Sequence, residues 1–417
     1  MAQRGRQYLW YNNWLRIFKD EVFRMALNIP SINFPKRLLM GPGPSEVDPR
    51  VYRAMIQPVI GHVDPLFLEC LSQLQQMLRD TFRTSNKVTF PIPGTGTAGM
   101  EAALINFLEP GEEAAVVVGG VFAGRMCEII GRCGAKLTRI DIPWGTIADP
   151  EQVRQAVRGK NLKVLGVVHS ETSTGVCQPL EPMREIAQET GALLVVDTVS
   201  SLGGLPLEVD RWGLDVCYSG SQKCLACPPG LAPITVGEHA MEVLRNRRAP
   251  VQSWYLDLSM IEKYWGPERT YHHTPPVNML FGLHEALRIL QQEGLEASWA
   301  RHRKCHLAFV AGLEALGMTM FVKDPALRAS TVNTITIPEG IEDAKFRARL
   351  MERFQIEIAG GLAQLKGRIW RVGLMGLTAT AASVLLLLSA MESVLAESGH
   401  GFDAGAGVAA AEKILAA

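Results

Sequence analysis

The chain has 417 residues and is 47% apolar, which is more than one hydrophobic core usually serves, so its composition predicts two domains. Its 42 Lys and Arg residues balance 42 Asp and Glu residues, and a formal charge of zero offers no basic field for nucleic acid. A charged fraction of 20%, with 39 Gly and 24 Pro scattered among apolar runs, is typical of an ordered globular protein and excludes a disordered chain or a small binding module.

The N-terminal 35 residues differ from the rest of the chain. Residues 1–30 carry five basic and two acidic side chains, and large apolar residues recur there at helical spacing: Trp10, Trp14, Phe18, Val22 and Met25. This pattern predicts an amphipathic arm, residues 1–35, that packs on a partner subunit; an upstream start codon is an equally simple explanation. A mitochondrial transit peptide is less favoured, because Asp20 and Glu21 are acidic and Ser is almost absent.

From residue 85 to 240, short β-rich runs alternate with amphipathic helical runs, which is the pattern of an α/β domain. The expected strands are 114–118, 136–142, 163–169, 192–197, 215–220 and 232–237. The expected helices are 98–108, 122–132 and 180–189. Because the strand runs are continuously apolar, they predict a mostly parallel sheet that is covered on both faces.

The pattern changes after Tyr255. The expected elements of this second part are a Pro-rich and aromatic loop at 264–276, a long helix over 277–306, a strand over 331–338, a helix over 342–354, a glycine turn at 360–361 and an apolar C-terminal helix. We therefore predict a large domain over residues 36–295 and a smaller α+β domain over residues 296–417.

Two further patterns bear on location. Eight cysteines in a chain of this length do not form a disulfide framework, and most lie in apolar runs, which favours a reducing, cytoplasmic compartment. Cys224 and Cys227 form a lone CxxC, which without a second pair or spaced histidines predicts packing and no metal site. The stretch Leu374–Met391 is nearly uncharged, but Arg371 and Glu392 flank it, so a buried helix is favoured over a membrane span.

The first candidate site is PGTGTAGMEAALINFL, residues 93–108. The Gly-Thr-Gly-Thr stretch at 94–97 leads directly into a helix, so backbone N–H groups, two hydroxyls and the positive end of the helix dipole form a cradle for an anion. The same glycines spell GxGxxG, but prolines interrupt the preceding run and no acidic residue ends the next strand, as a dinucleotide fold requires. A single phosphate is therefore favoured over NAD, although a helix start without any ligand stays open.

Two ionisable residues follow other expected strands, at the sheet edge where open α/β sheets bind ligands. Asp197 ends ALLVVD, where a carboxylate either meets a cationic partner or serves in a turn or helix cap. Lys223 follows a short strand among apolar residues, where burial lowers the pKa of an ammonium group, although most lysines are solvated surface groups. Together with the cradle, these residues supply the phosphate site, pyridinium partner and attachment amine that pyridoxal 5′-phosphate requires.

Seven separated motifs, in order along the chain, resemble those of a known family. They are RLLMGPGPSEV (37–47), PGTGTAGMEAAL (93–104), HSETSTGVCQPL (169–180), VVDTVSSLGG (195–204), YSGSQKCLACPPG (218–230), YHHTPPVN (271–278) and IWRVGLMG (369–376). From about residue 36 to the end, the chain resembles the class V pyridoxal-phosphate aminotransferases, and within them the alanine–glyoxylate (serine–pyruvate) group. The resemblance implies an aspartate-aminotransferase-like type I fold, with a mostly parallel seven-stranded sheet in the large domain and a smaller α+β domain after it.

The resemblance also implies roles for individual residues. Lys223 would form a Schiff base with the cofactor and move a proton during catalysis, Asp197 would pair with the protonated pyridine nitrogen, and Phe122 would stack on the ring. The other implied contacts are Thr95, Gly96, Thr97 and Gln222 at the phosphate, Thr172 at the phenolic oxygen with Ser201 nearby, and Tyr271 and Thr274 reaching the phosphate from a neighbouring subunit. A homodimer with shared active sites is therefore expected.

Substrate choice is less constrained. Arg371 resembles the family's clamp for the substrate carboxylate, and Gly43 in the Gly-Pro-Gly-Pro turn would leave room for a small substrate. No second basic residue is evident for a distal carboxylate, although Arg125 and Arg269 stay open. This favours alanine or serine as the amino donor and glyoxylate or pyruvate as the acceptor.

Several other activities compete with this one. A 2-aminoethylphosphonate or pyridoxamine transaminase remains an alternative within the same family. A cysteine desulfurase-like lyase also remains, but it is opposed by Phe122 at the stacking position and by the lack of a cysteine on an evident long loop. An NAD-dependent oxidoreductase and a non-catalytic scaffold are disfavoured by the combination of Lys223, Asp197 and the anion cradle.

Overall fold

The structure is a computed structural model that describes residues 31–417. The expected N-terminal arm, for residues 1–30, and the transit-peptide alternative therefore lie outside the described residues. Every helix and strand considered below belongs to residues 38–417, which form one unit by themselves.

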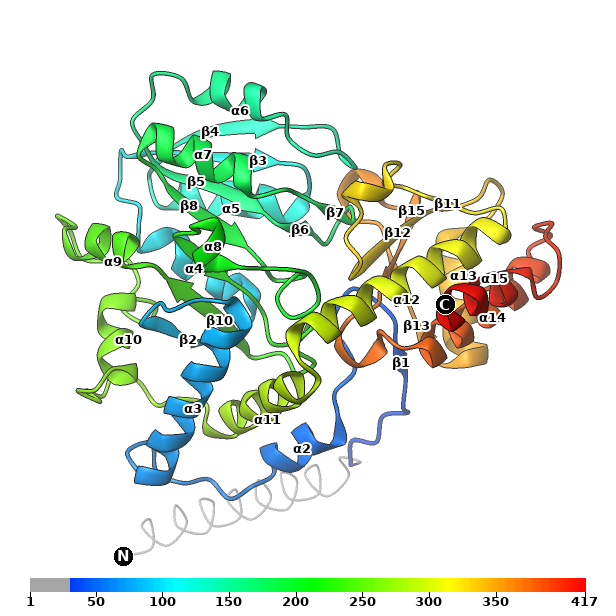
Figure 1. The fold of residues 1–417 in the computed structure, drawn as a ribbon, viewed down its shortest axis with the longest axis horizontal. Coiled ribbons are helices and arrows are strands. Elements are labelled where there is room, and N and C mark those ends of the chain that lie inside the picture. Colours follow the sequence, from blue (N-terminus) through cyan, green and yellow to red (C-terminus); the bar gives the residue numbers. More distant parts are fainter. Residues whose placement is uncertain (1–30) are drawn as a thin grey trace, which may run out of the picture. The chain divides into compact units, whose positions relative to one another are not determined.

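Strands and helices alternate along most of this unit (Figure 1). The strands are β1 Leu38–Leu39, β2 Val88–Pro93, β3 Glu113–Val118, β4 Lys136–Asp141, β5 Leu162–Val168, β6 Ser170–Glu171, β7 Val176–Cys177, β8 Leu193–Asp197, β9 Val216–Tyr218, β10 Leu231–Val236, β11 Thr319–Met320, β12 Val332–Thr336, β13 Ile356–Glu357, β14 Ala359–Gly360 and β15 Ile369–Gly373. The helices up to residue 293 are α2 Pro49–Met55, α3 Pro65–Phe82, α4 Gly96–Ile105, α5 Val121–Arg132, α6 Pro150–Val157, α7 Glu181–Thr190, α8 Val209–Trp212, α9 Glu238–Arg245, α10 Leu258–Trp265 and α11 Val277–Glu293. The later helices are α12 Leu295–Ala315, α13 Asp343–Phe354, α14 Ala381–Glu397 and α15 Ala406–Ala416, with 3-10 turns η1 Pro325–Leu327, η2 Ala363–Leu365 and η3 Gly376–Thr378.

A seven-stranded sheet in the order β2-β10-β9-β8-β5-β3-β4 organises the first part of the chain. β10 is antiparallel to both of its neighbours, and the other six strands run in one direction. The expected mostly parallel sheet is thus confirmed. One interpretation was wrong: Pro91 and Pro93 do not interrupt a strand but lie within β2, which is an edge strand, where the missing N–H of proline is tolerated.

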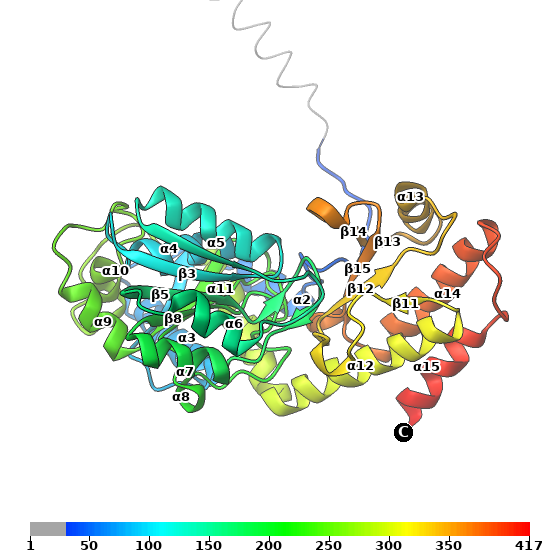
Figure 2. The ribbon, with the colours of Figure 1, turned by 90° about the horizontal axis from the view of Figure 1, so that it is seen from above.

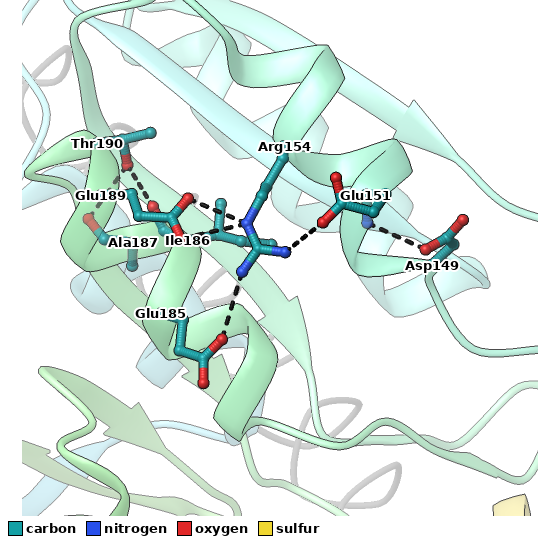
Figure 3. A network of polar contacts seen from close by, with 8 residues as sticks. All are labelled: Asp149, Glu151, Arg154, Glu185, Ile186, Ala187, Glu189 and Thr190. Carbon is teal, nitrogen blue, oxygen red and sulfur yellow. Dashed lines mark hydrogen bonds and ion pairs between the residues drawn. The ribbon is translucent and has the colours of Figure 1, made fainter.

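Helices cover both faces of this sheet, with α4 and α5 on one face and α3, α6 and α7 on the other (Figure 2). In the sheet order, the chain moves outwards from β3 to β4 and then back across β3 to β5. Because crossover connections are right-handed, this reversal places α5 and α6 on opposite faces of the sheet. An exposed ion-pair network joins α6 to α7 (Figure 3). Arg154 of α6 contacts Glu151 on its own helix at 2.6 Å, and Glu185 and Glu189 of α7 at 3.3 and 3.1 Å.

A second hydrophobic core lies in the C-terminal part, between the sheet β11-β12-β15-β14 and helices that include α12, α13 and α14. Its largest buried side chains include Trp370 and Phe346, whose rings stack with centroids 3.9 Å apart. Met40, far away in sequence, is buried in the same core, because β1 pairs in parallel with β13. The domain boundaries expected after residues 35 and 295 stay predictions.

Two expected elements differ in the structure. The run from residue 277 to 306 is not one helix, because Gly294 takes a left-handed φ of 87° between α11 and α12. The apolar stretch 374–391 is not one helix either, because the 3-10 turn η3 precedes α14, which begins at Ala381. The Thr380 hydroxyl caps α14 by accepting a hydrogen bond from the N–H of Ser383 at 3.1 Å. Among the residues that the structure describes, no helix is long and apolar enough to cross a membrane.

Candidate active site

Lys223 lies a few residues after β9, beneath the turn formed by residues 41–44. Its side chain is only 9% exposed, and its ammonium group donates a hydrogen bond to the carbonyl of Pro42. Ser45 ties the two segments together, since its hydroxyl donates to the Lys223 carbonyl at 2.7 Å and its N–H donates to the Gln222 carbonyl at 2.9 Å. Burial lowers the pKa of Lys223 to about 8, so a useful fraction of the amine is neutral and nucleophilic near neutral pH.

Gly43 lies directly against this lysine. It has a φ of +109°, and a Cβ added there would overlap the Lys223 Nζ and lie 2.7 Å from Cδ. The room for a small substrate that the sequence predicted at Gly43 stays a prediction. A glycine is required here for both reasons, the left-handed backbone and the close approach.

Asp197 ends β8 and is 2% exposed. One carboxylate oxygen accepts a hydrogen bond from the N–H of Val199 at 2.8 Å, and the other accepts one from the hydroxyl of Tyr218 at 2.9 Å. Burial raises the pKa of Asp197 to about 6, and these two hydrogen bonds and the charge of Lys223 act in the opposite direction. The carboxylate thus combines the two roles that the sequence left open: it accepts a hydrogen bond in the turn that follows β8, and it interacts with the charge of the buried lysine.

The predicted anion cradle is the start of α4. Thr95 stands at the N-cap position without a side-chain cap hydrogen bond, and the first N–H groups of the helix have no intrahelical partner. A Cβ on Gly96 would lie 2.9 Å from the side chain of Val199, so α4 packs closely on the turn that follows Asp197. The Thr97 hydroxyl accepts a hydrogen bond from Arg125 at 2.9 Å. This arrangement places the helix start next to the buried carboxylate.

Phe122 is on the first turn of α5, near the cradle. The guanidinium carbon of Arg125 lies 5.0 Å from the centre of its ring, which is cation–π distance. Glu171, a buried carboxylate that the sequence analysis did not single out, accepts hydrogen bonds from the N–H groups of Phe122 and Ala123 at 3.4 and 3.3 Å. Burial raises the pKa of Glu171. Glu171 therefore fixes the start of α5 and with it the backbone of Phe122.

Arg371 on β15 reaches the same region from the C-terminal part of the chain. It is 8% exposed and donates hydrogen bonds to the carbonyls of Gly360 at 2.8 Å and Thr172 at 3.2 Å. Its positive charge helps to lower the pKa of Lys223, and burial lowers its own pKa to about 10. The Thr172 hydroxyl bonds with that of Ser200. Across residues 31–417, Arg371 forms no ion pair, and the charge of the buried Glu171 acts to raise its pKa without a direct contact.

Tyr271 and Thr274 are not brought to this cluster by their own chain. Their hydroxyls lie 3.2 Å apart, Tyr271 is 55% exposed, and its ring centre is 5.0 Å from that of His62. Arg269 is also elsewhere, donating hydrogen bonds to the backbone carbonyls of Tyr264 and Trp265 and to Ser72. The expected role of Tyr271 and Thr274 in a neighbouring subunit stays a prediction.

The cysteines and histidines do not form a metal centre in the part of the chain that the structure describes, where no group of three or more possible ligands occurs. Burial raises the pKa of Cys224 and Cys227 to about 12 and that of Cys305 to about 11. Thiols with such pKa values are poor nucleophiles near neutral pH.

The residues that come together fit pyridoxal 5′-phosphate. They offer a buried amine, a buried carboxylate, hydroxyls and helix N–H groups, which match the aldehyde, the pyridine nitrogen, the phenolic oxygen and the phosphate of this cofactor. Seven buried side-chain polar atoms have no hydrogen-bond partner within residues 31–417. Two of them are the hydroxyl of Ser201, which follows Asp197, and the side-chain carbonyl of Gln222, which precedes Lys223, so both are available to a ligand bound at these residues.

Comparison with known proteins agrees with this interpretation. Residues 66–377 match the model of the family described as aminotransferase class V, and the chain belongs to this family. Its fold is therefore the type I fold of these enzymes, and its cofactor is pyridoxal 5′-phosphate.

Three relatives show how close the likeness is. The (S)-ureidoglycine–glyoxylate transaminase of Bacillus subtilis is 38% identical, over 90% of this chain and 95% of that protein. The crystal structure of alanine–glyoxylate aminotransferase from Nostoc sp. has a TM-score of 0.87 and 44% identity, covering 89% of this chain and 98% of that one. The crystal structure of pyridoxamine–pyruvate aminotransferase from Mesorhizobium loti also has a TM-score of 0.87, with 26% identity, covering 93% of this chain and 99% of that one. The chain is thus an aminotransferase whose relatives differ in amino donor.

Proposed function

We propose that this aminotransferase moves the amino group of a small amino acid, alanine or serine, to glyoxylate or pyruvate. The observation that carries the proposal is Arg371, a buried guanidinium that acts on the charge of Lys223 and that forms no ion pair within residues 31–417. Arg125 also forms no ion pair within residues 31–417, but its hydrogen bond to Thr97 places it at the start of α4, and Arg269 lies among other residues. A substrate with one carboxylate satisfies this site, whereas the second carboxylate of glutamate would be desolvated without a partner.

Glyoxylate is the better supported acceptor. The names of the Bacillus subtilis and Nostoc relatives share glyoxylate and differ in the amino donor. Ureidoglycine is accordingly a second candidate donor, favoured by the 38% identity to the Bacillus subtilis enzyme. A desulfurase activity is disfavoured, because the thiols of Cys224 and Cys305 are buried and their pKa values are raised.

The proposed roles follow from the contacts described above. When bound, pyridoxal 5′-phosphate supplies an electron sink for the bond broken at the substrate's α-carbon. Arg371 binds the substrate carboxylate through its guanidinium fork and fixes the direction of the α-carbon. Lys223, released by the substrate amine, would take the α-proton on Nζ and deliver it to the C4′ carbon of the cofactor, and a pKa of about 8 suits it to both accept and donate this proton. Asp197 would pair with the pyridine nitrogen of the bound cofactor, and Phe122 would stack on its ring.

The phosphate contacts in this proposal are the α4 start with Thr95, Gly96 and Thr97, together with Gln222. Tyr271 and Thr274 complete the site from a second subunit, so the active species is a homodimer. The side chains of both residues are exposed, and their hydroxyls bond to each other and to no other group among residues 31–417, which supports this assignment. A cytoplasmic location is proposed as well, since all eight cysteines are free thiols.

The experiment is half-reaction kinetics with alanine, serine, ureidoglycine, glutamate, pyridoxamine and 2-aminoethylphosphonate, and with glyoxylate and pyruvate. Arg371→Leu is expected to weaken every one-carboxylate substrate by about 100-fold or more, since it removes a charge-assisted fork. Arg371→Lys, the matched control, keeps the charge and recovers part of the loss. Preference of the unmodified enzyme for glutamate, pyridoxamine or the phosphonate, or an Arg371→Leu variant with unchanged kinetics, would contradict the proposal.

A further inference from the structure

We propose that Tyr218 is a positioning residue for the cofactor: its hydroxyl holds the Asp197 carboxylate in the orientation and charge state that the pyridine nitrogen requires. The inference rests on the proposed role of Asp197 and extends it to a residue that no motif of the sequence analysis singled out for this purpose.

Sheet register brings the two residues together. β8 and β9 are parallel neighbours, and Asp197 is the register partner of Tyr218, so the two strands end side by side. Both side chains are buried, with exposures of 2% for Asp197 and 0% for Tyr218, and the hydroxyl donates to the carboxylate at 2.9 Å. Hydrogen bonds to an ionised acceptor in such surroundings are among the strongest in proteins.

The surrounding chain holds Tyr218 in one place. The N–H and the hydroxyl of Thr198 both donate to the Tyr218 carbonyl, at 2.9 and 2.8 Å. On the side of α4, a Cβ on Gly99 would lie only 3.3 Å from the Tyr218 Cβ, so the helix backbone packs closely against the tyrosine. The ring is therefore enclosed by the same helix whose start forms the anion cradle.

The hydroxyl can act only as a donor here. Burial, reinforced by the charge of Asp197, raises the pKa of Tyr218 well above its usual value, so the phenol keeps its proton throughout the working range. The charged groups that face Asp197 are Lys223, which favours its ionised form, and Glu171 on β6, which opposes it. α4 contributes the uncharged Gly96, and His169 contributes its backbone N–H, which donates to the Asp197 carbonyl. The tyrosine is thus one of few groups that favour the carboxylate.

The test is the affinity of the cofactor-free, full-length protein for pyridoxamine 5′-phosphate, whose amine does not condense with Lys223. Binding is measured between pH 5.5 and 8.5 for the unmodified protein and for Tyr218→Phe, which removes one oxygen and keeps the ring. In the unmodified protein, affinity rises as Asp197 ionises, around its pKa of about 6. In Tyr218→Phe we expect the rise in affinity to lie about one pH unit higher, because one hydrogen bond to the charged group is lost. Affinity should then be roughly threefold weaker at pH 6.5, and the two proteins should converge towards pH 8.5.

Three variants make this result specific. Tyr264→Phe is the matched control, because Tyr264 is also buried and its hydroxyl donates to the His62 carbonyl, at 2.7 Å; it should leave the profile unchanged. Asp197→Asn should bind weakly without the pH-dependent rise. Adding Tyr218→Phe to Asp197→Asn should cause no further loss, since the tyrosine acts through the carboxylate.

The outcomes separate the two proposals. The role of Tyr218 is overturned, and that of Asp197 left intact, if the Tyr218→Phe profile equals that of the unmodified protein. The same holds if Tyr218→Phe causes an equal loss with and without the Asp197→Asn substitution. An Asp197→Asn variant that binds pyridoxamine 5′-phosphate like the unmodified protein overturns both roles.

Discussion

Replacement of Gly43 by alanine tests the contact between the glycine turn and Lys223. A Cβ at this position would overlap Nζ and lie 2.7 and 2.8 Å from Cδ and Cε, whereas ordinary contacts begin near 3.4 Å. The lysine side chain must therefore move by roughly 0.7 Å or more, and the turn must also keep a φ of +109°. Backbone strain of about 1–2 kcal/mol should lower the free energy of unfolding, whereas displacement of the flexible end of the lysine adds little to this loss.

The larger effect should be on catalysis. A misplacement approaching 1 Å in a reacting group costs about 100-fold in rate, and we expect a loss of that order in kcat/KM together with weaker covalent attachment of the cofactor at Lys223. Gly41→Ala is the control, two residues away in the same turn, because its Cβ would meet only Ala359, at 3.8 Å. Steady-state kinetics, the visible spectrum and thermal unfolding are compared for both variants. Equal behaviour of Gly43→Ala and Gly41→Ala would refute the reasoning.

Three other predictions concern the same site. In the cofactor-free protein, reductive labelling of Lys223 by pyridoxal should level off above about pH 8, because the pKa of Lys223 is lowered to that value. Surface lysines should keep gaining reactivity towards pH ~10.5. Peptide mapping measures the labelled positions, and a label confined to another lysine would contradict the prediction. The pKa of Asp197 is raised from 3.8 to about 6, so the folded cofactor-free protein binds the proton more tightly than the unfolded chain. The free energy of unfolding should therefore fall by up to about 3 kcal/mol as the pH rises from 4 through 6. Urea unfolding measures this loss, which should be absent from Asp197→Asn because an amide does not titrate. If Tyr271 and Thr274 serve a second subunit, dilution to monomers should release the cofactor, and sedimentation that shows a fully active monomer would disprove this.

Much of the fold was predictable because its strands are apolar runs bounded by polar residues. The six expected strands and the mostly parallel sheet are present, and the residues that follow β8 and β9 lie together, as parallel strand ends must. β2 was missed because Pro91 and Pro93 argue against a strand unless its edge position is known. The break at Gly294 was missed because the apolar spacing continues on both sides of it.

The site was predictable to the extent that its residues follow strands or belong to recognisable motifs. Lys223, Asp197 and Arg371, from three distant segments, do come together. Tyr218 and Glu171 were not assigned roles, because their partners are chosen by strand register and by the position of a helix start. A periodic sequence pattern carries neither kind of information. Tyr271 and Thr274 depend on another subunit, which one chain does not contain.

The two prolines of β2 have a consequence for assembly. Exposed sheet edges invite other chains to add a strand, and proteins guard against this with proline or with charged side chains. Here one edge, β2, contains Pro91 and Pro93, and the opposite edge, β4, exposes Lys136 and Asp141 and carries Arg139 between them. The central sheet is therefore poorly suited to grow from one molecule into the next. In the homodimer proposed above, contacts between copies would therefore come from elements other than the edges of this sheet, which leaves the ends of its strands, where the reactive residues gather, free to be completed by a neighbour.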